Sequence, residues 1–184
     1  MLHWEEAAAA ALDDIYECGI EVDGVGALRR YLDRIISEMW TLRPNDQEDM
    51  RVAWRKFGAM ARALGQELEF PIFSKNSDPV HHVVCRKQRD YGHQNIARFG
   101  RQGLMVRMHD KVARLENLLS SGRRPNNESI EDNIVDLIGY SCLGIMWEDG
   151  TFMLACNTTT VAETPRPVGL VANFLSSGHR VSQP

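Results

Sequence analysis

The chain has 184 residues, of which 43% are hydrophobic and 25% charged, and its formal net charge is −4 at pH 7. This length suffices for a buried core without disulfide or metal cross-links. The mildly acidic balance lacks the general basic field on which non-specific binding to DNA or RNA depends. A local basic patch remains compatible with a phosphorylated small molecule, so polymeric nucleic acid is the less favoured partner.

Cysteine use and hydrophobic patterning predict a cytoplasmic protein. The four cysteines are far apart in the sequence and form no CxxC pair, which is typical of buried thiols in a reducing compartment. Acidic residues occupy the N-terminal positions where a secretion signal would carry basic charge. No apolar run has the length of a membrane span, so we expect no membrane partner.

The N-terminal helical region, residues 1–75, is expected to contain three helices. An alanine-rich stretch of high helix propensity predicts the first over residues 4–18. Apolar residues at helical spacing predict the second over residues 25–40. Pro44 then breaks the chain, and Asp46 is a suitable N-cap for a third helix over residues 47–64. A polar loop separates this region from the rest.

Three further helices are expected in the central region, residues 76–148. One begins at Pro79 and ends near Tyr91, a glycine-punctuated linker follows over residues 92–103, and the last two helices cover residues 104–120 and 128–147. Residues 149–184 form a C-terminal extension in which residues 151–156 are a candidate strand. The expected fold is mainly α, a helical bundle of about five to six helices with an irregular C-terminal tail and one short β element.

The helix over residues 104–120 carries a basic stripe beside its core face. Arg107, Lys111 and Arg114 follow i, i+4, i+7 spacing, which places them on one side of a helix. One such side chain readily extends from the core edge into water. Three cations in one stripe repel each other, however, and therefore favour an anionic partner: carboxylates of another helix or a phosphate.

The last predicted helix supplies carboxylates at matching spacing. Glu128, Asp132 and Asp136 recur at i, i+4, i+8, and this arrangement favours either a facing basic stripe or a bound Mg²⁺. Acidic residues also favour the positive N-terminal end of a helix, which accounts for Glu128 but not for Asp136 two turns further on. A short linker makes the two helices antiparallel neighbours, so we expect Lys111 and Arg114 within reach of Asp132 and Asp136.

Three sequence blocks occur together and in order. They are KQRDYG at residues 87–92, LMVRMHDKVARLENL at residues 104–118, and NESIED at residues 127–132 followed by Asp136 and Tyr140. This pattern resembles the nucleotide-modification-associated domain family, a helical family of phages and bacteria that genome context links to modified-nucleotide metabolism. The resemblance covers residues 79–147, and it implies a nucleotide-binding protein that acts in the cytoplasm of the bacterium or phage host.

The acidic layout is also similar to that of MazG-like nucleotide pyrophosphohydrolases, which hold Mg²⁺ on a triphosphate through two helical motifs, ExxE and ExxD. Glu128, Asp132 and Asp136 are candidates for the second motif, whereas no ExxE precedes them in the matching region. Mg²⁺-dependent cleavage therefore stands beside binding alone as an outcome of the resemblance.

The main hypothesis is nucleotide binding, with or without Mg²⁺-dependent (pyro)phosphohydrolysis, in a helical cleft. Basic side chains would hold phosphate oxygens, carboxylates would bind a Mg²⁺ that activates water, and aromatic side chains would contact the base. The candidate catalytic residues are Asp90, Asp132 and Asp136, the candidate metal ligands are Glu128, Asp132 and Asp136, and the candidate substrate-binding residues are Arg107, Lys111, Arg114, Tyr91, His93 and Tyr140.

Two alternatives belong to other functional classes. A metal phosphohydrolase of the HD type, also helical, would bind a transition metal through His81 or His82, the His109–Asp110 pair, and Asp132 or Asp136. A non-enzymatic protein would instead bind a nucleotide signal or a partner protein, and its charged sets would form an ion-pair network between helices. A second copy of the chain is a further candidate partner.

Overall fold

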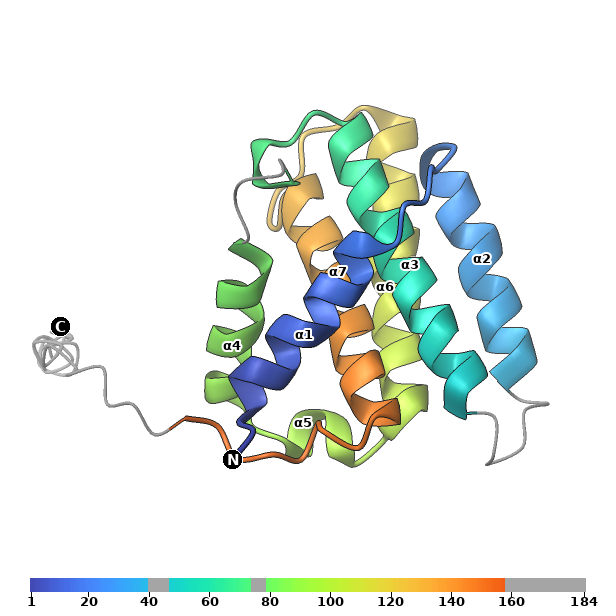
Figure 1. Cartoon of the computed structure of the whole chain (residues 1–184). Helices are drawn as coiled ribbons and strands as arrows, with labels where there is room; N and C mark the ends of the chain where they lie inside the picture. Colours follow the sequence, from blue (N-terminus) through green and yellow to red (C-terminus); the bar gives the residue numbers. More distant parts are fainter. Residues whose placement is uncertain (40–46, 74–78, 158–184) are drawn as a thin grey trace, which may run out of the picture.

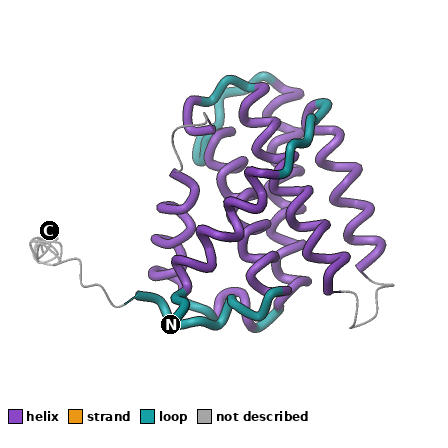
Figure 2. The backbone as a smooth tube through the Cα atoms, viewed as in Figure 1, coloured by secondary structure: helices purple, strands orange, loops and turns teal. Residues whose placement is uncertain are grey.

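Helices account for most of the computed structural model, which describes residues 1–39, 47–73 and 79–157 (Figure 1). These residues form seven α-helices and one short 3₁₀ helix, and no strand occurs among them (Figure 2). The mainly α prediction is therefore confirmed. One helix was not predicted, because it is only four residues long and lies inside the glycine-punctuated linker.

The elements follow the predicted order with shifts of a few residues at their ends. In chain order they are α1 (Trp4–Glu17), α2 (Gly24–Met39), α3 (Gln47–Glu67), η1 (Pro71–Phe73), α4 (Pro79–Tyr91), α5 (Gln94–Ala97), α6 (Gly100–Ser121) and α7 (Ile130–Glu148). No helix among the described residues is both long and apolar enough to cross a membrane.

The strand predicted over residues 151–156 is wrong, because the backbone groups of this segment bond to helices instead of to another strand. Thr151 and Phe152 donate their N–H groups to the carbonyl oxygen of Met146, at 2.9 and 3.0 Å. The backbone N–H of Trp4 donates to the carbonyl of Ala155 at 3.0 Å. The segment therefore lies across the N-terminal end of α1 as turns and loop. The rest of the expected C-terminal tail, residues 158–184, lies outside the described residues.

Local sequence signals set the ends of α4 and α6. Pro79 occupies the first position of α4, where a missing N–H costs little. Gly92 follows the last residue of α4 with a φ of 65°, and its N–H donates to the carbonyl of Gln88 at 2.8 Å. Gly122 ends α6 in the same left-handed conformation, with a φ of 60°. Glycine adopts this conformation without a steric penalty, so each of these two helices ends beside a glycine.

The central helix of the bundle is α7, which packs against α1, α3, α4 and α6 (Figure 1). Its buried side chains join those of the N-terminal helices, for example Trp54 and Phe57 of α3, in one hydrophobic core. Residues 1–75 and 76–148 thus contribute to a common core. The contacts with α1, α3, α4 and α6 cover α7 on more than one side.

A buried ion pair fixes the C-terminal end of α7. The side chain of Glu148 is 1% exposed, and its carboxylate pairs with the guanidinium of Arg101 from α6. Arg101 Nε donates to Glu148 Oε1 at 2.6 Å, and the indole N–H of Trp54 donates to the same oxygen at 3.2 Å. Gly144 allows this approach, because a Cβ there would lie 2.4 Å from the ring of Trp54. Three helices therefore meet at one buried carboxylate.

Replacement of Arg101 by methionine should lower the free energy of unfolding by about 3 kcal/mol, because the carboxylate of Glu148 then stays buried without its cation. Urea denaturation at neutral pH measures the loss. Arg98→Met, which removes an exposed arginine, is the matched control and should change stability by less than about 0.5 kcal/mol. The double variant R101M/E148Q should recover part of the loss. Equal stability of R101M and R98M would contradict this account.

Candidate functional site

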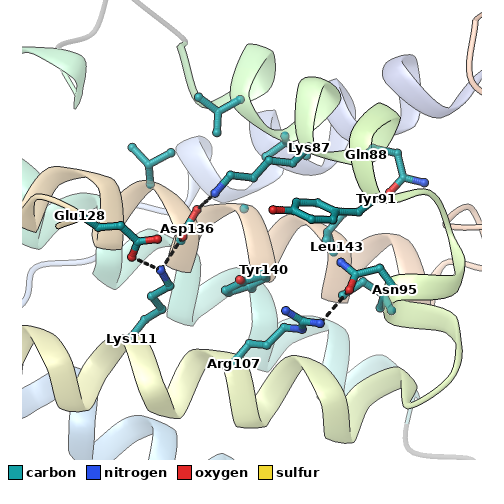
Figure 3. Close-up of a pocket in the computed structure, with 15 residues that line it drawn as sticks. Lys87, Gln88, Tyr91, Asn95, Arg107, Lys111, Glu128, Asp136, Tyr140 and Leu143 are labelled. Carbon is teal, nitrogen blue, oxygen red and sulfur yellow. Dashed lines mark hydrogen bonds and ion pairs between the residues drawn. The ribbon is translucent and has the colours of Figure 1, made fainter. Parts of the chain in front are cut away.

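A pocket of about 220 Å³ opens between α4, α5, α6 and α7 (Figure 3). Valine, isoleucine and leucine side chains form its apolar wall, and Gly139 of α7 lies where a Cβ would come within 3.1 Å of Val84 of α4. Its polar lining consists of Lys87, Gln88, Tyr91, Asn95, Arg107, Lys111, Glu128, Asp136 and Tyr140. The pocket thus gathers residues from all three sequence blocks that carry the family resemblance.

Asp136 is the buried acid of this pocket, with a side chain that is only 8% exposed. Its Oδ2 accepts a contact of 2.8 Å from Lys111 Nζ of α6, and its Oδ1 accepts a hydrogen bond from Lys87 Nζ of α4. Lys111 Nζ also donates to Glu128 Oε2 at 2.6 Å (Figure 3). The predicted contact between Lys111 and Asp136 is therefore confirmed.

Lys87 is a pocket residue to which the sequence analysis assigned no role. It lies on α4 between Val83 and Tyr91 at i, i+4, i+8 spacing, and all three side chains line the pocket. This spacing places them on one helix face. The same spacing rule that revealed the stripe on α6 would therefore have revealed Lys87, once α4 was known to face the last helix.

The ammonium of Lys111 is strongly held in its charged form. Burial alone would lower its pKa, but the hydrogen bonds and negative charges of Asp136 and Glu128 outweigh burial and raise the pKa above its ordinary value. Lys111 is therefore a cation across the physiological pH range, and it does not serve as a base.

Arg107 is the cation of the pocket that faces a neutral partner. Its Nη2 donates to the side-chain oxygen of Asn95 from α5 at 2.8 Å. Among the described residues, no carboxylate lies within ion-pair distance of its guanidinium. Figure 3 shows this guanidinium beside Tyr140, on the pocket side of α6. The amide of Asn95 orients the guanidinium without neutralising it.

The predicted reach of Arg114 to Asp132 and Asp136 is wrong. Arg114 Nη2 donates to the backbone carbonyl of Glu128 at 2.9 Å, and its Nη1 lies 3.8 Å from the Glu128 carboxylate. The reason is the start of α7, which begins at Ile130 and leaves Glu128 in the preceding turn. Glu128, Asp132 and Asp136 therefore do not form one helical stripe, and Arg114 is bonded to the turn.

Asp132 closes the N-terminal end of α7. Its Oδ2 accepts hydrogen bonds from the backbone N–H and the hydroxyl of Ser129, at 2.9 and 2.8 Å. Ser129 Oγ in turn accepts the N–H of Asp132 at 3.0 Å, which completes a capping box. Ser129 is thus the N-cap of α7. The hydroxyl and backbone of Ser129 lower the pKa of Asp132 below its usual value, and the nearby charges of Lys87 and Lys111 add to this effect.

Two further predicted site residues lie apart from the pocket lining. Asp90 is exposed on α4. His93 Nε2 donates to the carbonyl of Leu154 at 2.9 Å, and its ring meets the edge of Phe152. The structure therefore places His93 at the contact with residues 151–157 instead of facing a ligand in the pocket.

Each candidate metal ligand already has a partner within the protein, and Glu128 and Asp136 share Lys111. Glu128 pairs with Lys111, Asp132 with Ser129, and Asp136 with both lysines of the pocket. In the described part of the chain, no group of three or more His, Cys, Asp or Glu side chains is placed to hold a metal ion. The Mg²⁺ site and the HD-type site stay predictions. His81 Nε2, one proposed ligand, donates to the carbonyl of Glu5 at 3.0 Å.

No protein-family model, curated protein or solved structure matches the chain. The family resemblance therefore stays a prediction.

Ser129→Ala should destabilise the protein by about 1 kcal/mol at neutral pH through loss of the cap. The folded pKa of Asp132 lies below its unfolded value, so its contribution is present above the unfolded pKa and is lost as the pH falls through the folded pKa. The stability difference between wild type and S129A should therefore shrink below about pH 4.

Urea denaturation of both proteins at a series of pH values tests this expectation. Ser120→Ala is the matched control, because Ser120 is exposed near the C-terminal end of α6, donates its hydroxyl to the carbonyl of Asn117 and takes no part in this cap. A difference between wild type and S129A that is independent of pH would contradict the role of the Asp132 carboxylate.

Proposed function

We propose that the chain binds a nucleotide, or a phosphorylated small molecule of similar shape, in the pocket between α4, α5, α6 and α7. The observation that carries this proposal is the uncompensated guanidinium of Arg107, which faces the same pocket as the rings of Tyr91 and Tyr140 (Figure 3). A cation without an anionic partner suits the phosphate of a nucleotide, and flat aromatic surfaces beside it suit the base.

The phosphate end of such a ligand has a suitable partner in Arg107. A guanidinium presents several N–H donors in a planar fork that suits phosphate oxygens, and Asn95 occupies one Nη2 donor of Arg107. The half-buried position of Arg107 strengthens its attraction to a phosphate relative to that of a fully solvated arginine.

The base end has a suitable surface in the rest of the lining. Tyr91 and Tyr140 come from different helices, and Tyr91 is 65% exposed although it is a large aromatic residue. Aromatic rings stack on nucleobases, and ligand pockets combine apolar walls with a few polar groups that fix orientation. The amides of Gln88 and Asn95 are such groups.

Binding without cleavage is the form of this function that the geometry supports best. The two carboxylates of the pocket that were expected to hold Mg²⁺, Glu128 and Asp136, are both in contact with Lys111. A metal would have to displace Lys87 or Lys111 from the buried Asp136, and the displaced ammonium would lose this carboxylate and lie near a second cation.

Isothermal titration with a panel of canonical and modified nucleotides tests the proposal. We expect Arg107→Met to weaken binding at least tenfold, because it removes a charge-assisted hydrogen bond worth about 1.5–3 kcal/mol. Arg98→Met, which removes an exposed arginine outside the pocket, should leave the affinity unchanged. The absence of binding by every nucleotide, or equal affinity of R107M and wild type, would defeat the proposal.

Cleavage is tested in the same preparation. Phosphate and pyrophosphate release are followed with and without Mg²⁺. Mg²⁺-dependent turnover that Asp136→Asn abolishes would establish the hydrolase in place of binding alone.

A further inference from the structure

We infer that the pocket takes a nucleotide with a single phosphate, that this phosphate binds Arg107, and that Asn95 is the residue that positions Arg107. The inference rests on the proposed nucleotide-binding function and names the class of ligand. It follows from the way in which the charges of the pocket are already matched.

Two of the three cations that line the pocket have carboxylate partners. Lys87 and Lys111 both contact Asp136, and Lys111 also contacts Glu128. Asp136 is 8% exposed, so withdrawal of its lysines toward a ligand would leave a buried carboxylate without a cation. Among the described lining residues, Arg107 alone carries a charge that no carboxylate matches.

One free guanidinium suits one phosphoryl group. A phosphate monoester carries about −1.5 to −2 charges at neutral pH, and each further phosphate adds negative charge. Glu128 and Asp136 lie together at the Lys111 end of the pocket, away from Arg107 (Figure 3). A second or third phosphate would either approach this end of the pocket, where the carboxylates already hold both lysines and leave no unmatched cation for it, or remain in solvent, where it gains little. Affinity should therefore not rise with the number of phosphates.

Asn95 makes this charge available. Its side-chain oxygen accepts the hydrogen bond from Arg107 Nη2 at 2.8 Å. An aspartate in its place would keep an acceptor of the same shape and would add the negative charge that neutralises Arg107. If Asn95 served only to hold Arg107 in place for stability, Asn95→Asp would leave phosphate affinity unchanged. If Asn95 holds Arg107 in position to bind a phosphate, the carboxylate of Asn95→Asp neutralises the guanidinium and weakens phosphate binding.

The experiment measures the affinity of the full-length protein for one nucleoside and its 5′-mono-, di- and triphosphates by isothermal titration. Ionic strength is held constant, and no divalent metal is added. Inorganic phosphate serves as the probe for the phosphate site alone. We expect the monophosphate to bind at least tenfold tighter than the nucleoside, and the di- and triphosphates to bind no tighter than the monophosphate.

Variants then separate positioning from folding. N95D should weaken monophosphate binding at least tenfold, while its thermal unfolding midpoint stays at or above that of wild type, because a carboxylate pairs with Arg107. Asn117→Asp is the matched control, because Asn117 is exposed on α6 outside the pocket and its replacement makes the same change in net charge. Binding by N117D should equal that of wild type.

The outcomes distinguish this inference from the proposed function. A triphosphate that binds tenfold tighter than the monophosphate would overturn the single-phosphate inference and leave nucleotide binding in place. Wild-type affinity of N95D would overturn the positioning role of Asn95. Failure of every nucleotide to bind would defeat the proposed function and this inference together.

Discussion

The pocket depends on the burial of one carboxylate, that of Asp136 on the central helix. A buried charge must be matched, and here Lys87 of α4 and Lys111 of α6 both match it. The ion contacts therefore tie two outer helices to α7 from opposite sides. The pocket lies between these helices, and its shape and its charge follow from the same interaction. Both lysines are held by carboxylates within the fold, so Arg107 is the cation that we propose for recognition of a ligand.

The helices themselves were largely predictable, because apolar spacing, proline and glycine act locally. The basic stripe on α6 and its contact with Asp136 also followed from spacing and a short connection. The start of α7 was predicted two residues too early, although Ser129 and Asp132 have the spacing of a capping box in the sequence. That two-residue shift leaves Glu128 in the turn before α7, outside the helix that carries Asp132 and Asp136. Helix α5 was not predicted, because four residues are too few to show a helical period of apolar side chains.

Of the three cations of the basic stripe on α6, only Lys111 has a partner that could be predicted from the sequence. Equal spacing made Arg107, Lys111 and Arg114 look equivalent, yet one contacts a neutral amide, one a buried carboxylate and one a turn. Each partner comes from a different segment of the chain, and long-range packing decides which segment meets which position. A charged stripe thus indicates where an anion belongs, whereas the tertiary partners decide which cation is left to bind it.

The contact between Trp4 and the segment after α7 has a consequence for the order of events during synthesis. The indole N–H of Trp4 donates to the carbonyl of Phe152, 148 positions later in the chain. Contacts of such long sequence separation form late, because a large loop must first close. Helix α1 leaves the ribosome before the residues that follow it, so it has to wait for Phe152 before this contact can form. Its alanine-rich sequence, which favours a helix without tertiary support, suits that wait.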